Sequence, residues 1–111
     1  MIKQSVSIVI PVYNEDESIP SLYSEVKNAL EIFPSHEIIF INDGSYDNSL
    51  EEITKLVEKD SSVLAIDLYN NFGKADALNE GFKVASGDII ITMDADLQDD
   101  PAEISNLINK I

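Results

Sequence analysis

The residues best suited to chemistry are two aspartates that follow an apolar run late in the sequence. Asp94 and Asp96 come directly after Ile89-Ile90-Ile91-Thr92-Met93. Side chains two residues apart in an extended segment point the same way, about 6–7 Å apart, so both carboxylates could bind one hard cation. Mg2+ and Mn2+ prefer such oxygens and keep positions for water and phosphates. With Gln98 as a neutral oxygen donor, the spacing predicts a divalent metal site at Asp94, Asp96 and Gln98.

Two aspartates alone are as common in loops and helix caps as in metal sites, so the surrounding elements must decide. Runs rich in Val and Ile predict strands at Val6–Val12, Glu37–Asn42, Val63–Leu68 and just before Asp94. Residues with helical spacing alternate with these runs and predict four helices, with inward faces at Leu22, Val26, Leu30 and Phe33, at Leu50, Ile53, Leu56 and Val57, at Ala75, Leu78, Phe82 and Ala85, and at Ile104, Leu107 and Ile108. Their starts are marked by Pro20, by Asp47 or Asn48, and by Pro101, while Gly87 ends the third. This alternation predicts an α/β fold, with a parallel sheet covered by helices on both faces.

In such a sheet, right-handed crossovers bring all four strand-to-helix turns to the same edge. Polar residues that are distant in sequence therefore gather there: Asn14, Glu15, Asp43, Asn70, Asn71, Lys74, Asp94, Asp96 and Gln98. Gly44 and Gly73 lie in the same turns and permit a close backbone approach or a positive φ, although a glycine alone more often marks only a tight turn. The clustering predicts a ligand site at this edge.

Composition limits the classes of protein and of partner. The 111 residues are 44% hydrophobic and contain no cysteine, which indicates one globular domain without disulfides or thiolate chemistry. No apolar run approaches the roughly 20 residues that cross a bilayer, so we expect a soluble, cytoplasmic chain. The formal net charge of −14 argues against nucleic acid as a partner. His36 has no sequence neighbour that would orient it as a base, and we expect it at the surface or in a turn.

Four segments resemble motifs of the family 2 glycosyltransferases of GT-A fold. They are Ser7-Ile8-Val9-Ile10-Pro11-Val12-Tyr13-Asn14-Glu15, Ile41-Asn42-Asp43-Gly44-Ser45, Asn71-Phe72-Gly73-Lys74 and Met93-Asp94-Ala95-Asp96-Leu97-Gln98-Asp99. They occur in the family's order and span nearly the whole chain. The likeness is closest to the dolichol-phosphate mannosyltransferase-like branch, which uses polyprenyl phosphates. The resemblance implies a Rossmann-like nucleotide-diphospho-sugar transferase fold.

The resemblance also implies roles for the four motifs. A UDP- or GDP-sugar would be the donor, with the Glu15 position on the ribose and the Asp43 position on the base. Asp94, Asp96 and Gln98 would hold Mg2+ or Mn2+ on the diphosphate. Nucleotide contacts are implied at Pro11, Tyr13, Glu15, Asp43, Lys74, Asp94 and Ala95. Family members transfer the sugar with inversion to an acceptor such as a polyprenyl phosphate or a glycan, as in the synthesis of cell-envelope polysaccharides and glycolipids.

The chain departs from the family pattern at several positions and in length. Asn42 stands where a second acid is frequent, and Asn70 where an arginine is common, which leaves Lys74 as the nearby cation. Family members also continue well beyond residue 111. We therefore expect residues 1–111 to be the N-terminal nucleotide-sugar-binding part of a GT-A domain, with the general base in the continuation. Such a fragment should bind donor without catalysing transfer, and its exposed surface could form homo-oligomers. The branch implies that the full-length protein works at the inner face of a membrane.

Two alternatives remain open from the sequence. An apolar strand that ends in two aspartates also occurs in haloacid-dehalogenase-like phosphatases, in which Asp94 would be the nucleophile. The acids could otherwise belong to the surface of a non-catalytic domain that binds a nucleotide or a protein. Loss of metal-dependent nucleotide binding on substitution of Asp96 would argue against that second alternative.

Overall fold

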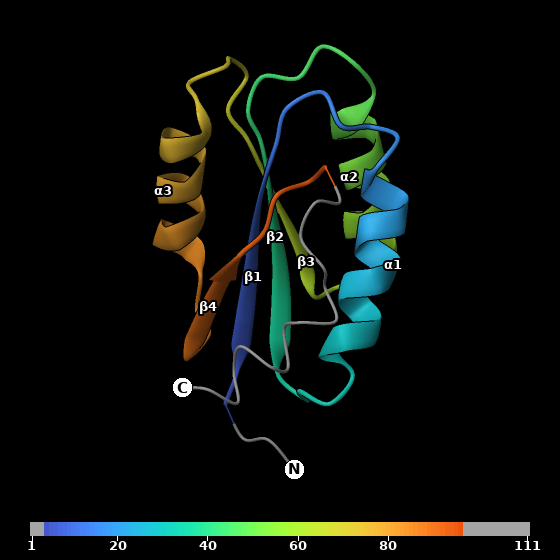
Figure 1. Cartoon of the computed structure of the whole chain (residues 1–111), viewed down its shortest axis with the longest axis vertical. Coiled ribbons are helices and arrows are strands. Elements are labelled where there is room, and N and C mark those ends of the chain that lie inside the picture. The colour runs from blue at the N-terminus through green and yellow to red at the C-terminus, as the bar shows by residue number, and fades with distance from the viewer. Residues whose placement is uncertain (1–3, 97–111) are drawn as a thin grey trace.

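A parallel β-sheet forms the centre of the protein (Figure 1). The computed structural model describes residues 4–96. They contain β1 (Val6–Val12), β2 (His36–Asn42), β3 (Val63–Asp67) and β4 (Ile89–Thr92), in the spatial order β3-β2-β1-β4. All neighbouring strands in this part of the chain run parallel, which confirms the predicted sheet.

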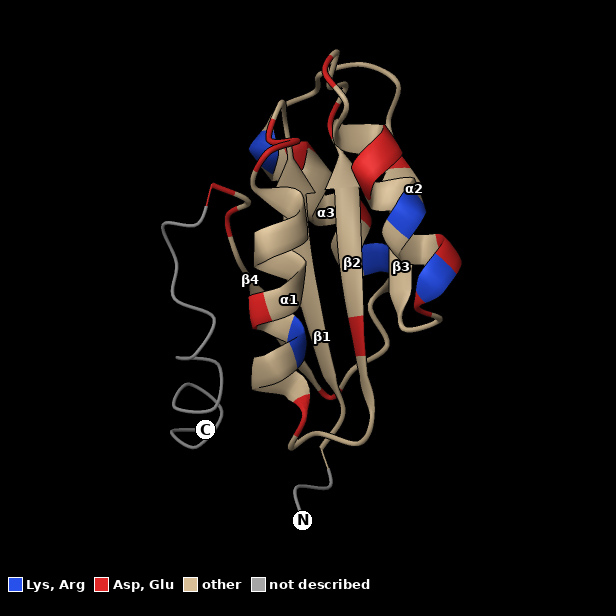
Figure 2. Ribbon diagram, turned by 90° about the vertical axis from the view of Figure 1, so that its right-hand side faces the viewer, with Lys and Arg blue, Asp and Glu red and all other residues tan. Residues whose placement is uncertain are grey.

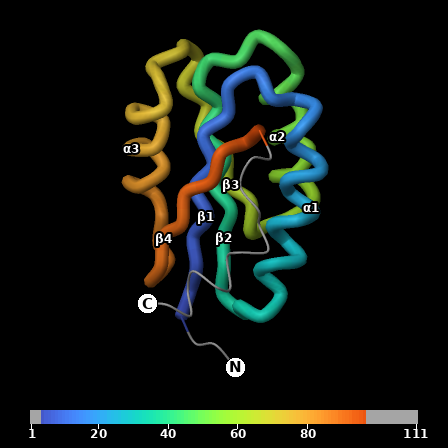
Figure 3. Tube along the Cα trace, viewed as in Figure 1, coloured from blue at the N-terminus to red at the C-terminus, as the bar shows by residue number. Residues whose placement is uncertain are grey.

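Helices cover both faces of the sheet, as predicted. α1 (Ile19–Leu30) and α2 (Ser49–Lys59) lie on one face and α3 (Lys74–Val84) on the other (Figure 1). The trace in Figure 3 shows each helix connecting one strand to the next, so the loops that follow the strands meet at one end of the sheet. The last predicted helix, from Pro101 onward, lies outside the described residues. Within residues 4–96 no helix is long and apolar enough to cross a membrane.

Two groups of buried side chains fill the space between the sheet and its helices. The larger group lies beneath α1 and α2 and includes Ile8, Ile10 and Phe40, whereas the smaller lies beneath α3 and includes Val9 and Ile41. Successive residues of a strand point to opposite faces, so β1 and β2 are buried on both sides. This explains why these strands read in the sequence as continuous apolar runs.

The face that α3 turns to the sheet agrees with the predicted one in part, since Leu78 and Ala85 pack against the buried group beneath it. Ala77 and Gly81 are buried there, whereas Ala75 is exposed and Phe82 is 43% exposed. The reason is close packing, since a Cβ atom built on Gly81 would lie 2.4 Å from Cγ1 of Val9. The helix thus approaches the sheet through its smallest residues, which a search for large apolar residues at helical spacing does not select.

The predicted inward residues of α1 are all buried, whereas the end of α1 and the predicted face of α2 need correction. Phe33 is fully buried as predicted, but α1 already ends at Leu30. On α2, Leu50 and Val57 are each 37% exposed, and Ser49 is fully buried in addition to the predicted inward residues. A buried serine is tolerated at this position because its hydroxyl accepts a hydrogen bond from the neighbouring loop, as described below.

Glu37 fixes the connection between α3 and β4 to the sheet. One of its carboxylate oxygens accepts hydrogen bonds from the Ser7 hydroxyl at 2.6 Å and from the N–H and hydroxyl of Ser86 at 2.7 and 3.1 Å. Burial raises the pKa of Glu37, but these hydrogen bonds outweigh burial and lower the pKa below its usual value. The folded state therefore prefers the charged carboxylate.

We expect the Glu37→Gln variant to lose less stability in acid than the wild-type chain. Because the pKa of Glu37 is lower in the folded state, its contribution is present above the unfolded pKa and is lost as the pH falls through the folded value. The free energy of unfolding should thus fall more steeply from about pH 5 to about pH 3 in the wild type. Urea unfolding followed by circular dichroism measures both slopes. Equal slopes would show that the charge of Glu37 does not stabilise this connection.

A second polar cluster lies at the amino ends of the strands, at the opposite end of the sheet from the loops that follow the strands. Tyr23 donates a hydrogen bond to Asp60 at 2.6 Å, and Lys27 forms an ion pair with the same carboxylate at 3.1 Å. Burial, together with the hydrogen bond and charge of Asp60, raises the pKa of Tyr23 to about 12. His36 begins β2 here, with Nε2 3.0 Å from Nζ of Lys27. Its place at this end keeps it away from the carboxyl ends of the strands.

Candidate functional site

A pocket opens at the carboxyl ends of the strands, where the direction of chain winding changes. β2 and β3 lie on one side of β1 and β4 lies on the other, and the helix that precedes β4 crosses the opposite face. Ligands of open α/β sheets bind at such a switch point. The pocket has a volume of about 370 Å³ and is lined by Pro11, Val12, Tyr13, Glu15, Asp43, Asn71, Gly73, Lys74, Asp94, Ala95 and Asp96.

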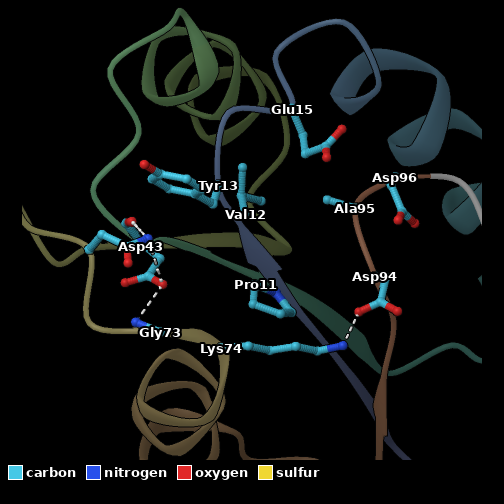
Figure 4. Close-up of a pocket in the computed structure, with 11 residues that line it drawn as sticks. Pro11, Val12, Tyr13, Glu15, Asp43, Gly73, Lys74, Asp94, Ala95 and Asp96 are labelled. Atoms are coloured by element: carbon cyan, nitrogen blue, oxygen red, sulfur yellow. Dashed lines mark hydrogen bonds and ion pairs between the residues drawn. The ribbon is translucent and has the colours of Figure 1, made fainter.

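The lining contains every described residue that the sequence predicted for nucleotide or metal binding. Figure 4 shows Tyr13 and Asp43 on one side of the pocket and Lys74 and Asp94 on the other. Gln98, the remaining predicted ligand, lies outside the described residues. The structure thus brings the predicted residues together, and their individual roles in binding stay predictions.

The loop after β1 comprises residues 13–18 (the first loop), and the loop after β2 comprises residues 43–48 (the second loop). Asn14 connects these two loops. Asn14 has a φ of 54° and accepts a hydrogen bond from the N–H of Tyr46 at 3.0 Å, while its own N–H donates to Ser45 at 2.9 Å. The N–H of Glu15 donates to the buried Ser49 hydroxyl at 3.0 Å. Asn14 lies at the predicted edge of the sheet, but it does not line the pocket, and its side chain holds the two loops together.

Two aspartates strengthen the same connection. Asp47 accepts hydrogen bonds from the N–H groups of Asp16 and Ser49, and Asp16 accepts one from the N–H of Asn48. Burial raises the pKa of Asp47, but the hydrogen bonds from Ser49 and Asp16 lower it overall. Asp47 and Asn48 are the two predicted caps of α2. Asn48 occupies the N-cap position but makes no side-chain cap bond, whereas Asp47 accepts a hydrogen bond from the N–H of Ser49 in the first turn of the helix.

Asp43 connects the second loop to the loop after β3 (residues 68–73, the third loop). Its carboxylate is only 3% exposed and accepts hydrogen bonds from the N–H of Phe72 at 2.8 Å and of Gly73 at 3.0 Å. The side-chain amide of Asn71 adds a contact at 3.4 Å to the carboxylate and one at 3.2 Å to the Asp43 carbonyl. Both carboxylate oxygens thus hold the third loop, an interaction that sequence reasoning did not identify.

The third loop approaches the second at Gly44, where φ is 73°. A Cβ atom there would lie 2.3 Å from backbone atoms of Asn70 and Asn71, so the glycine is required for the close approach. Asn70 supplies this backbone contact and does not line the pocket. Phe72 is 56% exposed and faces a separate hollow over α3.

The two aspartates after β4 are arranged differently from the predicted straight strand. β4 ends at Thr92, and Asp96 lies in a turn that follows. The intervening Ala95 is 4% exposed, while both carboxylates line the pocket. Lys74, the first residue of α3, donates a hydrogen bond to Asp94 and forms an ion pair with it across the pocket (Figure 4).

The charges of the pocket decide what it can bind. Figure 2 shows acidic segments in the loops at this end of the sheet. Among the described lining residues, Lys74 is the one cation beside the carboxylates of Glu15, Asp43, Asp94 and Asp96. An anionic ligand would meet a net negative field here unless a cation accompanied it. The oxygen donors of Asp94 and Asp96 suit a hard divalent cation. In the part of the chain that the structure describes, no three His, Cys, Asp or Glu side chains converge as a metal-binding group.

Comparison with known proteins gives a family match and close relatives. The family described as Glycosyl transferase family 2 matches residues 7–111. The undecaprenyl-phosphate 4-deoxy-4-formamido-L-arabinose transferase of Yersinia pestis (strain Pestoides F) is 47% identical over 108 residues, and that of Yersinia enterocolitica is 46% identical. Each match covers 96% of this chain and 33% of the relative. The chain therefore spans about a third of the length of the curated relatives it matches.

Solved structures share the fold. The mannosyltransferase PcManGT from Pyrobaculum calidifontis, in complex with GDP-Man and Mn2+, aligns with a TM-score of 0.78 at 23% identity, over 86% of this chain and 28% of that one. A glucosyl-3-phosphoglycerate synthase from Mycobacterium tuberculosis with Mn2+ and UDP aligns at 0.76 and 23% identity, over 96% and 39%. TarS from S. aureus with UDP-GlcNAc aligns at 0.72 and 26% identity, over 86% and 27%. These similarities confirm the predicted GT-A fold.

Proposed function

Because this chain belongs to glycosyl transferase family 2, we propose that it forms the donor-binding part of an enzyme that transfers a sugar from a UDP- or GDP-sugar. The observation that carries the proposal is that one pocket, at the switch point of the sheet, collects residues from all four motifs. The family match favours this function over a haloacid-dehalogenase-like phosphatase or a non-catalytic domain.

The nucleoside occupies the side of the pocket formed by Tyr13, Glu15 and Asp43. Tyr13 is 45% exposed and stands edge-on to Tyr46, with ring centroids 6.2 Å apart, so its ring is held at the pocket rim. Glu15 supplies a carboxylate that can accept from ribose hydroxyls, and Asp43 one that can accept from a base N–H. A carboxylate has about four acceptor positions, so Asp43 can serve the base as well as the third loop.

The diphosphate occupies the other side, near Lys74, Asp94 and Asp96. Asp94 and Asp96, with Gln98, would hold Mg2+ or Mn2+ there, because carboxylate and amide oxygens are the ligands that such ions prefer. The ion, when bound, neutralises charge on the diphosphate as the nucleotide leaves. Lys74 adds a positive charge on the same side. The excess of carboxylates in the lining supports metal-dependent binding, since one lysine does not balance them.

The acceptor is a polyprenyl phosphate. The names of the similar Yersinia enzymes contain undecaprenyl phosphate, which supports an acceptor of this class. The acceptor attacks the anomeric carbon in line with the departing diphosphate, so transfer proceeds with inversion. The general base belongs to the part of the protein that this chain does not span, and the work of the whole protein lies in cell-envelope glycolipid synthesis at a membrane.

Calorimetric titration of the chain with UDP and with GDP, each with and without Mn2+, tests donor binding. We expect one nucleotide to bind about tenfold or more tightly with Mn2+, because Asp94 and Asp96 would hold the ion and its charge would offset that of the diphosphate. In the Asp94→Ala, Asp96→Ala double variant, Mn2+ should no longer increase the affinity for the nucleotide. A Glu51→Ala, Glu58→Ala variant, altered at exposed positions of α2, removes the same charge and should keep that increase in affinity. A folded wild-type chain without any metal-dependent affinity would contradict the proposal.

A further inference from the structure

Lys74 and Asp94 form an ion pair across the pocket, at the point where the diphosphate and the metal are proposed to bind (Figure 4). The lysine comes from the first turn of α3 and the aspartate from the segment after β4, so the pair joins two elements on opposite sides of the pocket. The side chain of Lys74 is 61% exposed and that of Asp94 is 36% exposed. An ion pair at such exposure contributes little to stability and exchanges readily.

The position of Lys74 is unfavourable for the helix that carries it. The amino end of a helix bears a partial positive charge, so a lysine at the first helical residue is repelled there. Local preference would place an acid or a cap residue at this position. A residue that opposes its local preference marks a functional requirement in many proteins. Here the cation is placed where it can reach Asp94.

Lys74 and a metal ion compete for Asp94. A carboxylate that binds a divalent cation cannot also be fully paired with an ammonium group. The metal ion and the Lys74 ammonium group would in addition repel each other if both lay beside Asp94. The Lys74 side chain is long and flexible, with three donors that can reach a phosphate as easily as a carboxylate. The described lining offers Lys74 several carboxylates but no second cation that could replace it.

We propose that Lys74 is an exchange residue that couples binding of the metal to binding of the donor. Before ligands bind, Lys74 neutralises Asp94 and so weakens the attraction of the pocket for a metal ion alone. When the diphosphate enters, Lys74 moves from Asp94 to a phosphate oxygen and leaves Asp94 to the metal. This coupling rests on the proposed function, and it predicts opposite effects of Lys74 on the two ligands.

The test measures the affinity for Mn2+ alone, from the loss of the free-ion signal in electron paramagnetic resonance. Lys74→Gln should bind Mn2+ about threefold to tenfold more tightly than the wild type, because the competing cation is gone. The same variant should bind the nucleotide about tenfold more weakly in the presence of saturating Mn2+, because a charged contact to phosphate is lost. Lys74→Arg keeps the charge and should leave Mn2+ affinity near the wild-type value.

Lys83→Gln is the matched control. Lys83 lies at the other end of the same helix, and its side chain is 69% exposed and pairs with Glu80. Lys83→Gln therefore changes the net charge by the same amount as Lys74→Gln, but does so away from the pair of Lys74 with Asp94. It should alter neither affinity. Unchanged or weaker Mn2+ binding by Lys74→Gln, while the Asp94→Ala, Asp96→Ala variant still loses binding, would overturn the exchange and leave the proposed function standing. Mn2+ affinity that is unaffected by that double variant would overturn both.

Discussion

The Asp43→Asn variant is expected to bind a nucleoside diphosphate about 100-fold more weakly than the wild-type chain. Asparagine has nearly the same volume but offers one oxygen, so the N–H of Phe72 or of Gly73 would face an NH2 group instead of an acceptor. Each hydrogen bond to a charged, buried group contributes about 1.5–3 kcal/mol, and about 1.4 kcal/mol corresponds to a tenfold change in affinity. Calorimetric titration in the presence of Mn2+ measures the loss.

The experiment also separates the two roles of Asp43. If Asp43 served the base alone, the variant would weaken binding of the monophosphate and the diphosphate by the same factor. Because Asp43 also holds the loop that leads to Lys74, we expect the diphosphate to lose more affinity than the monophosphate. Asp76→Asn, which alters an exposed acid in the first turn of α3, should leave both affinities unchanged. Equal losses for the two nucleotides in Asp43→Asn would contradict a positioning role.

The location of the pocket was predictable from the sequence for a physical reason. Parallel strands buried on both faces leave uninterrupted apolar runs, and the polar residues that follow each run must lie at the same edge of the sheet. The bounds of β1 were predicted without error, and those of β2 and β3 differ by one residue each. Four turns with oxygen-bearing side chains were therefore enough to place Tyr13, Asp43 and Asp94 around one pocket.

The hydrogen bonds that hold the pocket in shape were not predictable from the sequence. Asp43 accepts from backbone N–H groups about thirty residues away, and the Ser49 hydroxyl accepts from the N–H of Glu15. A backbone donor leaves no mark on the sequence, because every residue except proline carries one. The centre of the buried face of α3 escaped prediction because close packing selected Ala77 and Gly81, while hydrophobic periodicity selects large side chains such as Leu78.

These unpredicted contacts have one consequence for function. The first loop is tied to the second through Asn14 and Ser49, and the second is tied to the third through Asp43. The sides of the pocket at which the nucleoside and the diphosphate are proposed to bind are thus connected through backbone groups before any ligand arrives. Preformed geometry of this kind lowers the entropy that a ligand must lose from the protein on binding. A substitution that pushes two of these loops apart should therefore lower both the stability of the fold and the affinity for a nucleotide.

Gly44 is the position at which that separation is expected to be largest. In Gly44→Ala the new methyl group would meet the carbonyl carbon of Asn70 and the nitrogen of Asn71 at 2.3 Å, and both are backbone atoms that cannot turn aside. Strain at positive φ and displacement of the third loop together should lower the free energy of unfolding by about 4 kcal/mol. Nucleotide affinity should fall as well, because the same loop carries the N–H groups that Asp43 holds.

Gly73→Ala is the matched control for this effect, and urea unfolding followed by circular dichroism compares the two variants. Gly73 also has a positive φ, of 101°, but a Cβ atom there would meet nothing within 4 Å. Its substitution should therefore cost only the backbone strain, about 2 kcal/mol. Gly73 has a ψ of 158° in addition, a backbone region that is essentially restricted to glycine, so any greater loss of stability in Gly44→Ala reports the contact between the second and third loops. Equal losses of stability would show that the loops do not approach each other as closely at Gly44 as the structure places them, and the preformed pocket would then lose its main support.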